Sequence, residues 1–253
     1  MTSSREVARS FGEGYQDPER SSEELLDERI SGIVDLEQLV PVYEKFFDYA
    51  ATTEGVKSIL QALARLLVRL SPRMDEYRRI VSDDTSARLL SIFLQETMRI
   101  KQGEKKRIPI AFVYGSRFST DLDVVRDHLK SQVVKGEKAL LVTEYIDTGR
   151  TAMELSGCLH ALGVPHDLAV VSLRKQVKFY QRIDAPIIYG SIGDEGLAFW
   201  SRQDTGVVRG TDRELLSRRK VYGDTKQIKI NQARSAARTL ARDLSPVLSL
   251  VEP

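Results

Sequence analysis

The chain has 253 residues, 42% of them hydrophobic, which suffices for one sizeable core or for a core domain with an appendage. Its 38 Lys and Arg residues nearly balance 36 Asp and Glu residues, so charge does not point to nucleic acid or an anionic membrane as the main partner. A single cysteine, Cys158, excludes an intramolecular disulfide. Together with the lack of an apolar run of about 18 residues and of a secretion signal, this predicts a cytoplasmic protein with Cys158 in its core.

The first hundred residues are predicted to be a tail followed by helices. Apolar side chains are too few from Met1 to about Glu24 to offset the entropy of ordering the backbone, so we expect a mobile tail over residues 1–24. Apolar residues at three- and four-residue spacing then predict helices over Asp35–Ala51 and Ile59–Leu70, and a third from Met74 to Ile100 that is interrupted near Ser82. These helices form a helical extension over residues 25–103.

After residue 103 the pattern changes to alternating strands and helices, which defines an α/β domain over residues 104–253. Short apolar runs predict buried strands, and amphipathic stretches between them predict helices. The strands are expected at Ile108–Tyr114, Lys138–Ile146, Asp167–Leu173 and Pro186–Gly190, with helices from about Thr120, over Thr151–Leu162 and over Asn231–Leu244. This order is typical of a parallel sheet with right-handed crossovers.

The most informative segment runs from Ala139 to Ala152, where an apolar strand is followed by an acid and then by a compact turn that opens a helix. The start of a helix presents unpaired N–H groups and the positive end of the helix dipole, and both favour a phosphate. Gly149 lets the backbone approach that phosphate, while the hydroxyls of Thr148 and Thr151 can donate hydrogen bonds. The segment therefore predicts a sugar-phosphate cradle from Asp147 to Thr151.

This segment resembles the phosphoribosyl pyrophosphate signature of the type I phosphoribosyltransferases: four apolar residues, two acids, two mostly apolar residues, then Asp-Thr-Gly-x-Thr. The resemblance implies that the 5′-phosphate binds to Asp147, Thr148, Gly149, Arg150 and Thr151. It also implies that the ribose hydroxyls bind to Thr143 and Glu144, that Glu144 and Asp147 take part in catalysis, and that Mg²⁺ is a cofactor held by Glu144. Thr143 departs from the signature, because the family has an acid there.

Two further elements of the family have counterparts in the sequence. A loop after the first core strand binds pyrophosphate in the family, and the resemblance assigns this role to Gly115, Ser116 and Arg117, whose guanidinium can pair with phosphate oxygens in a fork. A hood over the base follows the last strands, and Phe199 and Trp200 are the candidates for stacking on it. The chain lacks the longer insertion that carries a mobile catalytic flap in the family.

Several alternatives stay open at this stage. The leading hypothesis is a phosphoribosyltransferase of nucleotide metabolism, and the second is a regulator that binds a nucleotide or sugar phosphate without turnover. A third places the function in the N-terminal helices, which would contact a protein partner or a second copy. Asp-Thr-Gly occurs at Asp147 and at Asp204 and also marks aspartic proteases, but the α/β pattern argues against that class. No catalytic role is expected for His128, His160 or His166.

Overall fold

The structure is a computed structural model that describes residues 21–46, 52–83, 87–103, 107–113, 122–146, 148–174, 183–193 and 224–250. Seven helices and five strands lie in these ranges, in the chain order α1 (Ser22–Ser31), α2 (Leu36–Tyr43), α3 (Thr53–Leu70), β1 (Arg79–Asp83), α4 (Arg88–Lys101), β2 (Ile110–Val113), α5 (Leu122–Lys130), β3 (Ala139–Ile146), α6 (Arg150–Ala161), β4 (His166–Arg174), β5 (Ile187–Gly193) and α7 (Asp224–Leu244). Short 3₁₀ helices follow α2, α3 and α7, at Glu44–Phe46, Ser71–Glu76 and Ser245–Ser249.

The five strands form one parallel sheet in the order β2-β1-β3-β4-β5. The predicted α/β class with a parallel sheet is therefore confirmed. Strands β2, β3, β4 and β5 and helices α5 and α6 lie at their predicted places, within a few residues at the ends, and α7 ends as predicted but begins at Asp224 rather than Asn231. The central strands are apolar on both faces, as expected of a parallel sheet that helices cover on either side.

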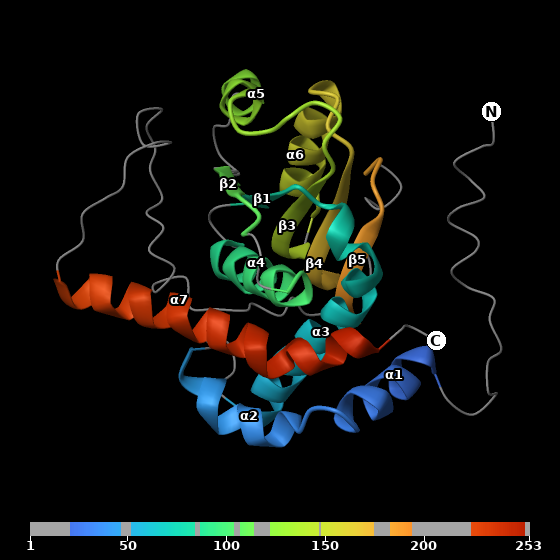
Figure 1. Cartoon of the computed structure of the whole chain (residues 1–253), viewed down its shortest axis with the longest axis vertical. Coiled ribbons are helices and arrows are strands. Elements are labelled where there is room, and N and C mark those ends of the chain that lie inside the picture. The colour runs from blue at the N-terminus through green and yellow to red at the C-terminus, as the bar shows by residue number, and fades with distance from the viewer. Residues whose placement is uncertain are drawn as a thin grey trace.

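Each face of the sheet has its own hydrophobic cluster. One cluster joins residues of β1, β3, β4 and β5 to α3 and α4, and beyond them to α1, α2 and α7. The other joins the opposite face of the sheet to α5 and α6. Figure 1 shows the resulting layers: α5 and α6 on one side of the sheet, α3 and α4 on the other, and α1, α2 and α7 outermost.

Two predictions about the N-terminal region are wrong. The predicted helix from Met74 to Ile100 is a 3₁₀ helix, the strand β1 and the helix α4. In β1, Ile80 and Val81 point to opposite faces and both are fully buried, which suits two β-branched residues in a central strand. The predicted tail also extended too far, because Ser21 and Glu24 form a capping box that starts α1 at Ser22.

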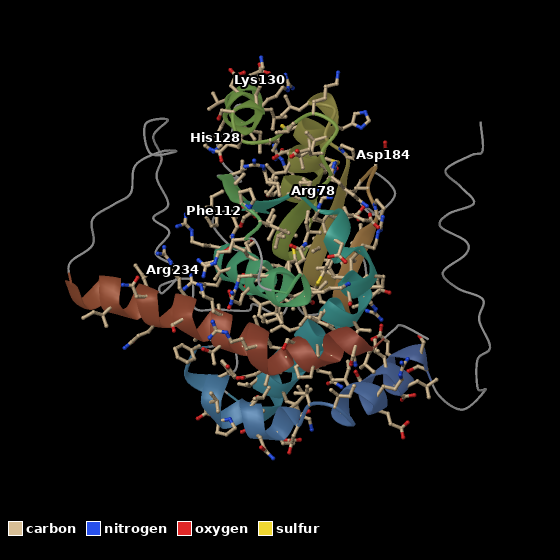
Figure 2. All side chains as sticks on the ribbon, viewed as in Figure 1. Arg78, Phe112, His128, Lys130, Asp184 and Arg234 are labelled. Carbon is tan, nitrogen blue, oxygen red and sulfur yellow. The ribbon has the colours of Figure 1, made fainter. Side chains whose placement is uncertain are left out.

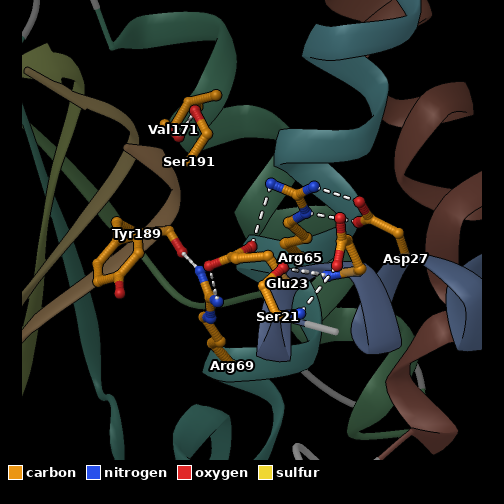
Figure 3. Close-up of polar contacts among 9 residues, drawn as sticks. Ser21, Glu23, Asp27, Arg65, Arg69, Val171, Tyr189 and Ser191 are labelled. Carbon is orange, nitrogen blue, oxygen red and sulfur yellow. Dashed lines mark hydrogen bonds and ion pairs between the residues drawn. The ribbon is translucent and has the colours of Figure 1, made fainter. Parts of the chain in front are cut away.

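The helix α1 is attached to α3 by ion pairs in addition to its buried side chains Leu26 and Ile30. Arg65 pairs with Glu23 and Asp27, and Arg69 also reaches Glu23 (Figure 3). Arg69 continues to the edge strand β5, where its guanidinium donates to the Tyr189 carbonyl at 3.0 Å and stacks on the Tyr189 ring. These contacts, the strand β1 and the shared cluster join the predicted helical extension to the sheet.

Candidate functional site

The order in which strands are added to the sheet reverses between the neighbouring parallel strands β1 and β3, because β2 lies beyond β1 while β4 and β5 lie beyond β3. After β1 the chain enters α4, which packs on one face of the sheet, and after β3 it enters α6, which packs on the other face (Figure 1). In open parallel sheets such a reversal leaves a crevice outside the carboxyl ends of the two strands, and ligands bind there. The predicted phosphate turn follows β3 directly, so it lies at this position.

The turn between β3 and α6 contains a left-handed glycine directly before the helix. Residue 147 lies outside the described residues, Thr148 is exposed and Thr151 is half-buried. Gly149 has a φ of 72°, a left-handed conformation that favours glycine, and it is the residue from which α6 starts. No described side chain caps this helix, so an external anion could accept hydrogen bonds from its first amides.

The helix α4, which follows β1, has a similar start. Its N-cap is Ala87, and within the described ranges no side chain caps it. By contrast, the helices α1, α2 and α3 are capped by Ser21, Asp35 and Thr52. The two helices that begin at the reversal point therefore both lack a described side-chain cap.

Both of these helices also begin with an arginine. The Arg88 guanidinium lies over the Phe112 ring at 4.4 Å from its centroid, on the carboxyl side of β2. Arg150 is 68% exposed, and its Nε donates to Glu154 one helical turn later at 2.8 Å. An exposed pair of this kind contributes about 0–1 kcal/mol, so a phosphate could compete for the guanidinium. The positive end of the helix dipole repels an arginine in the first turn of a helix, and an anion bound there would offset this repulsion.

Thr143 and Glu144 lie on opposite faces of β3, because side chains alternate along a strand. Thr143 is 7% exposed and lies in line with Ala139 and Leu141, on the side of α5 and α6. Glu144 is 2% exposed and lies in line with Leu140 and Val142, on the side of α3 and α4. The two predicted ribose ligands therefore face different helical layers.

Several predicted site residues lie outside the described residues, namely Gly115, Ser116, Arg117, Asp147, Phe199 and Trp200. The structure does show that β2 is not the first core strand, because β1 precedes it in the chain and lies between β2 and β3. Residues 84–87, rather than 114–117, thus follow the first core strand. A signal for this loop was present in the sequence, since Ile80-Val81 is followed by acids and by Thr85-Ser86 before a helix, much like the segment around Asp147.

The remaining candidate side chains serve the core. Cys158 is buried, as predicted, and burial raises the pKa of its thiol. His166 is buried with partners in Ser156 and in the Val164 carbonyl, and the Nε2 of His128 lies 3.1 Å from the Phe112 carbonyl oxygen (Figure 2). Both contacts are structural, and neither histidine lies beside the turn after β3.

Within the described ranges, no three acidic, histidine or cysteine side chains gather in a way that could hold a metal ion. In the same part of the chain, none of the helices has the length and apolar character needed to cross a membrane. Comparisons with models of known protein families and with curated proteins give no match to this sequence.

Proposed function

We propose that this chain binds a 5′-phosphorylated ribose at the carboxyl ends of β1 and β3 and transfers it as a phosphoribosyltransferase. The observation that carries the proposal is the start of α6, where a left-handed Gly149 and a helix without a described side-chain cap stand at the reversal point of the sheet. This is the position at which open α/β sheets bind ligands. The Asp-Thr-Gly-Arg-Thr sequence at Asp147 supports a phosphate as the ligand.

In the proposed reaction the bond between the anomeric carbon and a pyrophosphate oxygen breaks, and pyrophosphate leaves with the bonding electron pair. A nitrogen of a nucleobase or a related acceptor forms the new bond to that carbon and loses its proton to solvent; in the reverse reaction pyrophosphate attacks the same carbon and restores phosphoribosyl pyrophosphate. The protein contributes mainly by positioning the two reactants, which can supply a large part of the rate enhancement. Asp147 is proposed to face the base, and Phe199 and Trp200 are proposed to stack on it.

The pyrophosphate would bind near the start of α4, because residues 84–87 follow the first core strand. The Arg88 guanidinium at the head of this helix and the amides around it suit a pyrophosphate oxygen. Arg117 stays a second candidate from the sequence. Mg²⁺ prefers carboxylate oxygens, and Glu144 is the residue proposed to hold it; when bound, the ion would neutralise charge on the pyrophosphate.

A second candidate function is binding of a nucleotide or sugar phosphate without turnover. The observations that favour it are Thr143, which stands where the resemblance expects an acid, and the near-complete burial of Glu144. A weaker anionic field near the sugar would stabilise positive charge on it less well, which can cost a few kcal/mol in the transition state, roughly a hundredfold in rate. Such a protein would bind the phosphate at the turn before α6 but would not catalyse transfer of the ribose.

Calorimetry with phosphoribosyl pyrophosphate and Mg²⁺ tests the binding that both functions require. We expect micromolar affinity for the native chain and no measurable binding for Gly149→Val or Asp147→Asn. An unchanged affinity in both variants would refute the proposed site. Incubation with a pool of nucleobases then separates the two functions, because pyrophosphate release indicates the transferase and binding without release indicates the regulator.

A further inference from the structure

The strand β1 places a carboxylate beside Thr143. The register of β1 and β3 pairs Ile80 with Leu140, Val81 with Leu141 and Ser82 with Val142. Continued by one residue, this register sets Asp83 opposite Thr143. Paired residues on neighbouring strands point to the same face of a sheet, so Asp83 and Thr143 lie side by side.

Asp83 and Thr143 lie on the face of the sheet that packs against α5 and α6. Val81 and Leu141, two residues before Asp83 and before Thr143, both belong to the cluster that packs against α5 and α6. Asp83 is the last residue of β1, and it is 7% exposed, as Thr143 is. The pair therefore lies at the carboxyl end of the sheet, on the same side as the proposed phosphate turn.

We infer that Asp83 supplies the carboxylate that Thr143 lacks and binds the sugar of the phosphorylated ribose. This inference rests on the proposed function and assigns to its site a residue from a different strand. A ribose whose 5′-phosphate lies at the start of α6 extends its ring toward the neighbouring strand end. A carboxylate there accepts hydrogen bonds from the sugar hydroxyls, and Thr143 adds a neutral hydroxyl.

This placement separates the two acids of the site. Glu144 lies on the side of α4, where the pyrophosphate is proposed to bind, while Asp83 lies on the side of α6 with the 5′-phosphate. One carboxylate would thus serve the metal-bound pyrophosphate and the other the ribose. The signature has a negative charge at position 143 that this chain lacks, and Asp83 at the end of β1 would supply it instead.

The experiment moves the carboxylate from one strand to the other in the full chain. Calorimetry with ribose 5-phosphate and with phosphoribosyl pyrophosphate plus Mg²⁺ compares the native chain, Asp83→Asn, and the double variant Asp83→Asn with Thr143→Asp. We expect Asp83→Asn to weaken both ligands at least tenfold and the double variant to return to within about threefold of the native affinity. Inorganic phosphate, which needs only the turn before α6, should bind equally to all three proteins.

Each other outcome has a definite meaning. If the native chain binds neither ligand, the proposed function itself fails. If the native chain binds and Asp83→Asn binds equally well, or loses phosphate affinity as well, the role of Asp83 is refuted while the site stands. Should Asp83→Asn not fold, Thr143→Val serves instead: an affinity within threefold of native supports Asp83 as the main sugar ligand, and a tenfold loss assigns the sugar to Thr143 and overturns the inference.

Discussion

The Ser156 hydroxyl on α6 lies 2.7 Å from Nε2 of His166, the first residue of β4. The other ring nitrogen, Nδ1, lies 3.1 Å from the Val164 carbonyl oxygen, which can only accept a hydrogen bond. Nδ1 therefore carries a proton, and because burial lowers the pKa of the ring and favours its neutral form, Nε2 accepts from the Ser156 hydroxyl. A neutral imidazole thus ties α6, the helix that begins at the proposed phosphate turn, to the sheet.

The buried, neutral His166 predicts that the free energy of unfolding depends on pH. Burial is the main reason that the pKa of His166 is lowered, and the Val164 carbonyl and Asp167 oppose it, whereas His160 adds to the lowering. The unfolded chain therefore takes up a proton near pH 6.5 and the folded chain only at lower pH, so the free energy of unfolding falls as the pH drops below about 6.5, by up to about 1.4 kcal/mol per pH unit.

The variant His166→Gln keeps an acceptor for Ser156 and removes the titration. We expect it to be about 1 kcal/mol less stable than the native chain at pH 8, because an amide reproduces the ring contacts imperfectly. The difference should shrink as the pH falls toward 5.5. Urea unfolding at several pH values measures it, and a difference that stays constant across this range would contradict a buried neutral imidazole.

A second prediction concerns the amino ends of the strands, where Asp167 is 1% exposed, accepts a hydrogen bond from Tyr77 and forms ion pairs with Lys138 and Arg73. Removing one partner of such a buried group leaves the others uncompensated, so Asp167→Asn should lower the free energy of unfolding by about 3 kcal/mol. Tyr77→Phe deletes one hydrogen bond and should cost about 1–2 kcal/mol. Chemical unfolding at pH 7 compares them; a cost below 1 kcal/mol for Asp167→Asn would contradict the network.

Much of the α/β half was predictable from sequence because its signals are local. The strands β3 and β4 each contain four consecutive apolar residues, and the helix α6 follows a turn with glycine. The strand β1 was missed because only Ile80 and Val81 are strongly apolar among its five residues. Its place next to β3 is decided by tertiary packing, which no local pattern encodes.

The same limit applies to the candidate site. The turn after β3 could be predicted because strand, turn and helix are contiguous in the chain. The position of Asp83 near Thr143, inferred from the register of β1 and β3, could not, since it depends on the order of strands in the sheet. Burial of Glu144 was also beyond the sequence, because it depends on which helices cover each face.

A third prediction tests the close packing of α3 on β5. A Cβ at Gly190 would lie 2.1 Å from the Ala62 carbonyl oxygen and 2.8 Å from that of Val171, and both are backbone atoms that cannot move aside. Gly190→Ala should therefore cost at least about 3 kcal/mol or prevent folding. Gly157→Ala is the matched control, because a Cβ there meets no heavy atom within 4 Å and an alanine at this exposed position of α6 should stabilise the protein by about 0.5–1 kcal/mol. Equal thermal stability of the two variants would contradict the packing.

The last prediction concerns the guanidinium at the start of α6. Arg150 and Arg126 are both exposed helical arginines that pair with an acid of their own helix, Glu154 and Asp123 respectively, but only Arg150 lies at the proposed phosphate turn. A charge-assisted hydrogen bond to phosphate contributes about 1.5 kcal/mol, so Arg150→Gln should weaken ribose 5-phosphate about tenfold. Arg126→Gln should leave the affinity unchanged.

Raising the salt concentration should weaken binding more in the native chain than in Arg150→Gln, because one ionic contact is already missing there. Equal affinities of the two variants in calorimetry would remove Arg150 from the site.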